Sequence, residues 1–127
     1  MFRQILLSLV LIAASVSAGA AGEIRSYDDA GFAAAQASGA PIVIHVTASW
    51  CPTCKAQQPT VESLANSATR PDLVVFEIDF DSQKDVLRTF NVRQQSTLIA
   101  FRGATERARA VGTTNPQAIE ELFEATR

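Results

Sequence analysis

The feature that most constrains this sequence is its single pair of cysteines, Cys51 and Cys54, which Pro52 and Thr53 separate. The apolar residues 41–46 precede the pair and a segment of helical composition follows it, so the pair is expected at a strand-to-helix junction. Unpaired N–H groups at the start of such a helix favour a thiolate at Cys51. Cys54, one turn further on, lies on the same face and can close a short disulfide. The pattern predicts a redox site that exchanges disulfides.

Other uses of a cysteine pair are weaker. A structural zinc site needs four ligands, and the only histidine in the sequence is His45. A purely structural disulfide across so short a loop removes little chain entropy. Two alternatives stay open: a Cu(I)-handling module that uses Cys51, Cys54 and His45 as soft ligands, and a partner-binding module in which the cysteines form a stable disulfide.

Residues 1–20 have the pattern of a secretory signal peptide. Residues 1–4 are short and basic, and the apolar run 5–16 is shorter than the roughly 20 residues that a membrane span needs. Small-residue cleavage patterns end at Ala18 and at Ala20, and both stay open. An uncleaved signal anchor is the alternative. We therefore expect a signal peptide over residues 1–20 and one mature domain over residues 21–127.

Export places the mature domain in an oxidising compartment such as a bacterial periplasm, without membrane insertion after cleavage. Loss of the signal removes Arg3 and leaves ten basic and thirteen acidic residues, a net charge of -3. Nothing in this balance indicates a nucleic-acid surface. We expect a monomer without a cofactor, whose partners are protein thiols and disulfides and a periplasmic or membrane redox protein.

The rest of the chain alternates strand and helix patterns. Residues 42–47 form a β-branched run typical of a strand buried on both faces, and Pro59 should kink the helix that contains it. Asp28 or Asp29 can cap the helix that follows it, Gly103 marks a hairpin, and Asn115 before Pro116 is a helix cap. Strands are expected at residues 23–26, 42–47, 73–80, 97–102 and 106–111, and helices at 28–37, 55–67, 82–90 and from 115 onward.

Several motifs around the cysteines match those of one known family. Trp50 precedes the first cysteine, Lys55 follows the second, and Pro59 comes five residues after Cys54. The segments 90–93, 97–101 and 111–112 complete the set in order. In these features, over nearly all of residues 21–127, the sequence resembles the thioredoxin-fold proteins.

The resemblance implies an α/β fold, a central mixed β-sheet flanked by helices on both faces with the cysteines at its edge. It implies that Cys51 attacks a disulfide, that Cys54 resolves the intermediate, and that Gln95 pairs through its backbone with an extended substrate. We accordingly expect an exported thiol–disulfide oxidoreductase. The expected substrate-binding residues are Trp50, Pro52, Thr53, Gln95 and Ser96.

The sequence departs from the family pattern at two places. The cis-proline usual before the fourth strand is replaced by Ser96, so the Gln95–Ser96 peptide bond is expected to be trans. Six residues before Cys51, where thioredoxins carry a buried aspartate, the chain has His45. A neutral imidazole can move protons near neutral pH, so His45 is a candidate catalytic residue, with core packing as the alternative. The direction of electron flow stays open, although Pro52-Thr53 resembles many oxidising members.

Overall fold

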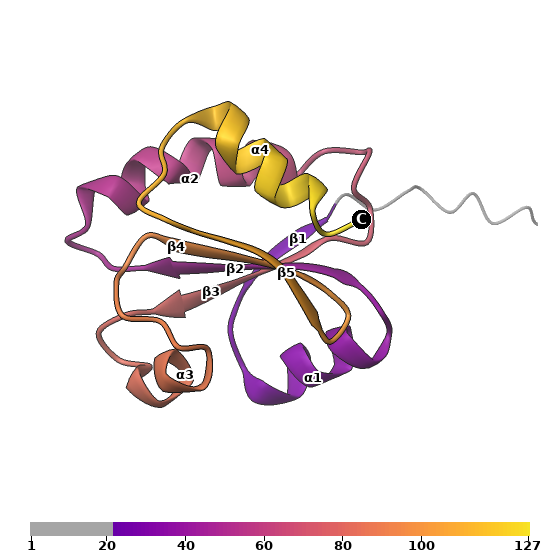
Figure 1. Ribbon diagram of the computed structural model, residues 1–127, viewed down its shortest axis with the longest axis horizontal. Helices are drawn as coiled ribbons and strands as arrows, with labels where there is room; N and C mark the ends of the chain where they lie inside the picture. Colours follow the sequence, from indigo (N-terminus) through magenta and orange to yellow (C-terminus); the bar gives the residue numbers. More distant parts are fainter. Residues whose placement is uncertain (1–21) are drawn as a thin grey trace, which may run out of the picture.

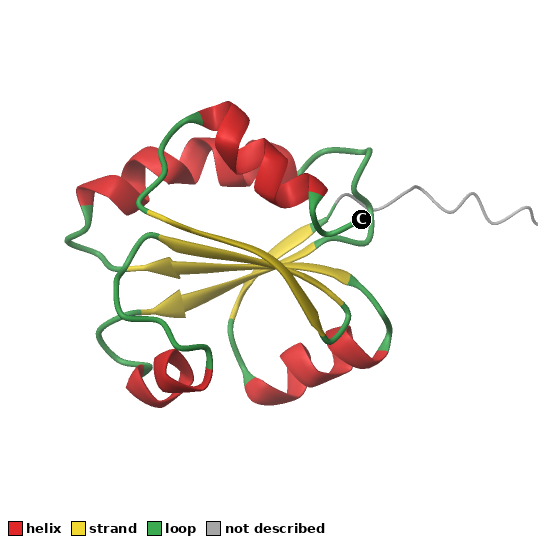
Figure 2. Cartoon of the chain, viewed as in Figure 1, coloured by secondary structure: helices red, strands yellow, loops and turns green. Residues whose placement is uncertain are grey.

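The computed structural model describes residues 22–127, so the predicted signal peptide lies outside the described residues. Strands and helices follow one another in the predicted order (Figures 1 and 2). The strands are β1 (Glu23–Ser26), β2 (Pro41–Thr47), β3 (Val74–Asp79), β4 (Thr97–Arg102) and β5 (Thr105–Val111). The helices are α1 (Asp29–Ala37), α2 (Pro52–Ala65), α3 (Lys84–Thr89) and α4 (Pro116–Glu124).

The five strands form one mixed sheet in the order β1-β3-β2-β4-β5. The strands β1, β3 and β2 are parallel, whereas β4 runs antiparallel to β2 and β5 antiparallel to β4. This is the mixed sheet that the resemblance implied. The carboxyl ends of parallel strands share one edge of a sheet, and an α/β fold binds its ligands there. The connection from β2 to α2, which carries the cysteines, leaves the sheet at that edge.

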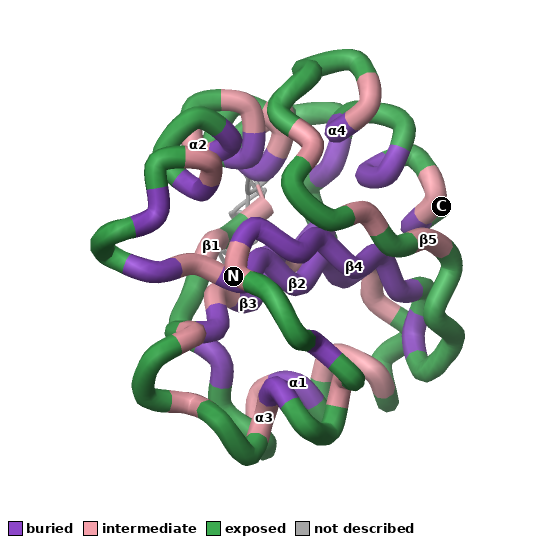
Figure 3. Tube along the Cα trace, turned by 60° about the vertical axis from the view of Figure 1, so that its left-hand side comes forward, coloured by how far each residue is buried: buried purple, intermediate pink, exposed green. Residues whose placement is uncertain are grey.

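Helices cover both faces of the sheet, with α2 and α4 on one side and α1 and α3 on the other (Figure 1). Alternate side chains of β2 serve the two layers, since Ile44 packs with the α1 side and Val43 with the α2 side. The central strands β2 and β4 are almost continuously buried (Figure 3). Edge-to-face and tilted rings fill the α1 side: Tyr27, Phe32, Phe76, Phe90 and Phe101.

Helix α2 starts three residues earlier than its composition indicated. Cys51 is the N-cap and Pro52 takes the first helical position, where its fixed φ fits and its missing N–H is not needed. The helix then continues through Pro59, which cannot donate to the carbonyl one turn before it; the predicted kink stays a prediction. The buried residues of the helix follow a helical spacing, namely Cys54, Gln57, Val61 and Ala65.

The expected caps and turn of the shorter elements are confirmed. Asp28 accepts from the N–H of Gly31 at 2.6 Å, and Asn115 accepts from the N–H of Ala118 at 3.1 Å. Gly103, in the hairpin between β4 and β5, has a φ of 54°, which favours glycine.

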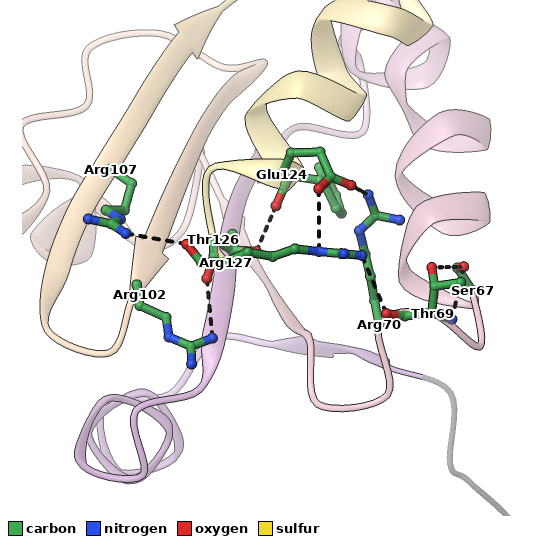
Figure 4. Close-up of polar contacts among 9 residues, drawn as sticks. Ser67, Thr69, Arg70, Arg102, Arg107, Glu124, Thr126 and Arg127 are labelled. Carbon is green, nitrogen blue, oxygen red and sulfur yellow. Dashed lines mark hydrogen bonds and ion pairs between the residues drawn. The ribbon is translucent and has the colours of Figure 1, made fainter.

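Arginine side chains fasten the end of α4 to the sheet and to the segment that follows α2 (Figure 4). Arg102, at the end of β4, donates to the backbone carbonyl of Thr126 at 3.5 Å. Arg70 forms an ion pair with Glu124. Positive charge near the carboxyl end of a helix is favourable, so these contacts hold α4 beside α2 over the same face of the sheet.

Candidate active site

Cys51 and Cys54 form a disulfide at the start of α2, with 5.3 Å between their Cα atoms. The backbone N–H of Cys54 donates to Cys51 Sγ at 3.0 Å, so this sulfur acts as the N-cap of the helix. A sulfur in this position faces the positive end of the helix and accepts a hydrogen bond that a thiolate strengthens. The expected placement of Cys51 over the first turn is confirmed.

Burial does not distinguish the two sulfurs in the disulfide form. Cys51 is 1% exposed and Cys54 3% exposed, and both pack with Ala48 and Phe80. The N-cap geometry distinguishes them instead, because Cys51 Sγ accepts the N–H of the first turn and Cys54 lies inside the helix. The asymmetry of the pair is therefore electrostatic.

The residues next to Cys51 form an exposed rim. Trp50 is 54% exposed, and its indole N–H donates to the Asp81 carboxylate at 2.8 Å. Pro52 is exposed and Thr53 half-buried. Asp81 belongs to the connection between β3 and α3, so this hydrogen bond ties the indole to a second segment. An apolar ring held in place beside the disulfide is suited to contact another molecule.

The segment before β4 approaches the disulfide through backbone contacts. The N–H of Ser96 donates to the carbonyl of Val46 at 2.8 Å, and this same carbonyl oxygen lies 3.7 Å from Cys54 Sγ. Ser96 has a φ of 59°, and its hydroxyl donates to the carbonyl of the half-buried Gln95 at 2.5 Å. No peptide bond between residues 22 and 127 is cis, which confirms the expected trans Gln95–Ser96 bond. The N–H that proline lacks is therefore used here to hold the loop.

His45 lies fully buried on the face of the sheet that α2 covers. Its Nε2 is 2.9 Å from Oε1 of Gln57, which extends from α2. The Gln57 amide nitrogen donates in turn to the carbonyls of Ser96, at 3.1 Å, and Thr113, at 2.8 Å. His45 and Ser96, which were predicted separately as site residues, are thus joined by one intervening side chain.

Burial lowers the pKa of His45 below its usual value of about 6.5, because the charged imidazolium loses its hydration. The hydrogen bond to Gln57 and the negative charge of Glu77 act in the opposite direction but are smaller. Glu77 is the partner of His45 in register on β3. His45 is therefore neutral at neutral pH, the state that can accept a proton.

The lowered pKa of His45 predicts that stability falls as the pH drops below about 6.5. The unfolded chain takes up a proton there and the folded chain does not, so the unfolded state binds more protons and the free energy of unfolding decreases. The expected slope is about 1.4 kcal/mol per pH unit until the folded His45 is protonated. Denaturant titrations of the wild type and of His45→Gln between pH 5 and pH 7.5 measure it. Because His45 is the only histidine, equal pH dependence in both proteins would contradict the prediction.

The described residues provide neither a cluster of metal ligands nor a helix able to cross a membrane. Within residues 22–127 no three His, Cys, Asp or Glu side chains are grouped so that they could hold a metal ion. Over the same residues, no helix combines the length and the apolar character that crossing a bilayer requires.

Comparison with known proteins agrees with this arrangement of sheet, helices and disulfide. The family model described as Thioredoxin matches residues 23–125. The chain belongs to the thioredoxin family. As in its relatives, the fold is a thioredoxin fold, and membership together with the Cys51–Cys54 pair makes the protein a thiol–disulfide oxidoreductase.

Two curated relatives and one solved structure illustrate the match. Thioredoxin Asp f 29 of Aspergillus fumigatus is 30% identical over 90 residues, which cover 71% of this chain and 81% of that protein. Thioredoxin H-type of Fagopyrum esculentum is 32% identical over 91 residues, covering 72% and 77%. The crystal structure of Trxlp from Edwardsiella tarda EIB202 has a TM-score of 0.77 and 44% identity, covering 80% of this chain and 98% of that one.

Two residues of this thioredoxin site, Gln57 and Asp81, were not predicted from the sequence. Gln57 could have been found from periodicity, since it lies three residues after Cys54 on the buried face of α2. No local signal indicated that Asp81 accepts from an indole 31 residues away.

Proposed function

We propose that this thioredoxin-family protein is an exported enzyme that exchanges disulfides with protein substrates, with Cys51 as the attacking and Cys54 as the resolving residue. The observation that carries the assignment is the hydrogen bond from the Cys54 N–H to Cys51 Sγ at the start of α2. After reduction, this contact stabilises negative charge on Cys51, and no N–H among residues 22–127 donates to Cys54 Sγ in the same way.

The exchange proceeds in two displacements. The Cys51 thiolate attacks one sulfur of a substrate disulfide, forming a mixed disulfide, and the other substrate sulfur leaves as a thiolate. The Cys54 thiolate then attacks Cys51 Sγ, which closes the Cys51–Cys54 disulfide and releases the second substrate sulfur. Two electrons pass from the cysteine pair to the substrate. The reverse sequence oxidises a substrate dithiol, and the potential of the pair decides which direction is used.

His45 is proposed to accept the proton that Cys54 must lose before it attacks. His45 is buried and neutral, and its Nδ1 has no hydrogen-bond partner among the described residues. A buried basic nitrogen without a donor is available to take up a proton. A His45→Gln variant tests the role: resolution near neutral pH should slow while attack by Cys51 is less affected. Stability loss with unchanged exchange rates would assign His45 to core packing.

The substrate is proposed to bind across Trp50, Pro52, Thr53, Gln95 and Ser96. Support comes from exposed apolar surface on this side of the molecule. Trp50 is 54% exposed and Val111 52% exposed, and they are the two large hydrophobic side chains that stand out in residues 22–127. Val111 pairs in register with Thr97, directly after Ser96. An extended substrate segment that crosses Ser96 would contact both apolar side chains.

The assignment of attacking and resolving residue predicts different reactivities in the reduced protein. Cys51 should be alkylated much faster than Cys54 at pH 7, with its rate reaching half of the maximum below about pH 8.5, the usual value for a free thiol. Alkylation rates against pH, read by peptide mass spectrometry, measure both residues. Faster labelling of Cys54 would reverse the assignment.

Export is proposed from the pattern of residues 1–20, with the mature domain monomeric in the periplasm and served by a membrane or periplasmic redox partner. Amino-terminal sequencing of the protein from cells tests it, and a mature chain starting at Gly19 or Ala21 is expected. A chain that starts at Met1 in the cytoplasmic fraction would contradict export.

A further inference from the structure

Gln57 is a buried polar residue that the family pattern around the cysteines does not explain. Its side chain is 0% exposed, on the face of α2 that also buries Cys54. Burying an amide costs free energy unless its donors and acceptor find partners. All the polar atoms of the Gln57 side chain have one, so the residue is held by specific contacts rather than by apolar packing alone.

The partners of Gln57 determine how its amide is oriented. The carbonyls of Ser96 and Thr113 can only accept, so the amide NH₂ must face them. Oε1 then faces Nε2 of His45 at 2.9 Å and must receive a proton from it. The neutral His45 therefore carries its proton on Nε2, and Nδ1 is the nitrogen with the free lone pair.

The same amide supports the Ser96 loop. The φ of 59° at Ser96 is unfavourable for a residue with a Cβ, so the surrounding contacts must hold it. The Ser96 carbonyl accepts from Gln57 and from the N–H of Gly112, at 3.1 Å each, while the Ser96 N–H donates to Val46. Gln57 thus connects the helix that carries both cysteines with the loop that lies against the Val46 carbonyl.

We propose that Gln57 is a positioning residue that holds the Ser96 loop and His45 in one arrangement. In this arrangement, Nδ1 of His45 is the atom that accepts the proton from the Cys54 thiol. The inference rests on the proposed function and goes beyond it, because it names the nitrogen of His45 that accepts the proton and the residue, Gln57, that fixes the tautomer of His45. Around His45, Glu77 on β3 is the charged neighbour in register, β4 presents Leu98, and α2 presents Gln57.

The test compares two variants of the full chain that each lose one amide from α2. Gln57→Met removes all three contacts, whereas Gln58→Met leaves His45 and Ser96 untouched and leaves the charge of Glu77 in place. The rate at which Cys54 resolves a mixed disulfide with a model peptide is measured from pH 5 to pH 9. Gln57→Met should resolve it about tenfold more slowly, with a changed pH profile, and Gln58→Met within about twofold of the wild type. Equal rates and profiles in the two variants would overturn the proposal.

A second measurement does not depend on activity. Nitrogen-15 NMR of the imidazole distinguishes the two tautomers, and His45 gives the only histidine signals. The wild type should show the proton on Nε2, and Gln57→Met should show a mixture. A proton on Nδ1 in the wild type would overturn the proposal. A wild type that exchanges no disulfides would instead contradict the proposed function, so the two failures are distinguishable.

Discussion

Replacing Cys54 with serine is expected to leave the chain covalently attached to its substrates. The variant keeps the Cys51 thiolate and the N–H that stabilises it, so attack on a substrate disulfide still occurs. Resolution then depends on external thiols, because the intramolecular nucleophile is absent. Well-placed intramolecular groups act at very high effective concentration, so the lifetime of the mixed disulfide should rise by about 10³-fold or more. Non-reducing gels of exported proteins, followed by mass spectrometry, detect the adducts.

Cys51→Ser is the matched control. It removes the attacking sulfur but retains Cys54, which lies inside the helix without the N-cap contact. No adducts are expected from this variant. Equal trapping by both variants would show that either sulfur can attack, and the assignment of roles would then be wrong.

Replacing Ser96 with proline, which restores the residue usual in the family, is expected to destabilise this chain. The ring fixes φ near -65°, whereas the loop has 59°, and the N–H that donates to Val46 is lost. A backbone conformation incompatible with proline and an unpaired buried carbonyl together should cost about 3 kcal/mol of unfolding free energy. Denaturant unfolding of the oxidised protein gives the value.

Ser96→Gly is the matched control, because it removes the serine side chain but retains both the positive φ and the N–H. Glycine accepts a positive φ and keeps the N–H to Val46, so this variant should lie within about 1 kcal/mol of the wild type. A Ser96→Pro protein as stable as Ser96→Gly would mean that the loop is not held by these contacts.

Elements with strong local patterns were predicted well from the sequence. The β-branched run of β2, the caps at Asp28 and Asn115, and the glycine of the β4–β5 hairpin are local signals, and each appears where expected. The start of α2 was misplaced by composition, which ignores that Pro52 suits the first helical position. The placement of Cys51 at the start of that helix was anticipated.

The contacts around the cysteines were beyond sequence reasoning because they join residues far apart in the chain. Gln57 meets Ser96 and Thr113 across 39 and 56 residues, and only the fold brings them together. The sequence showed that Ser96 replaces proline but not that its N–H would reach Val46. The buried position of His45 was expected, whereas its partner and its tautomer required the structure.

The central claim, that Cys51 and Cys54 are a redox-active pair, is tested most directly by the reduction potential of that pair. Equilibration with glutathione or dithiothreitol buffers, quenched by alkylation and read by mass, gives the value. We predict reversible two-electron behaviour between about -270 mV, near thioredoxin, and about -120 mV, near strong oxidants. The position within that range indicates the direction of electron flow. A potential below about -300 mV, the range of structural disulfides, would contradict the claim.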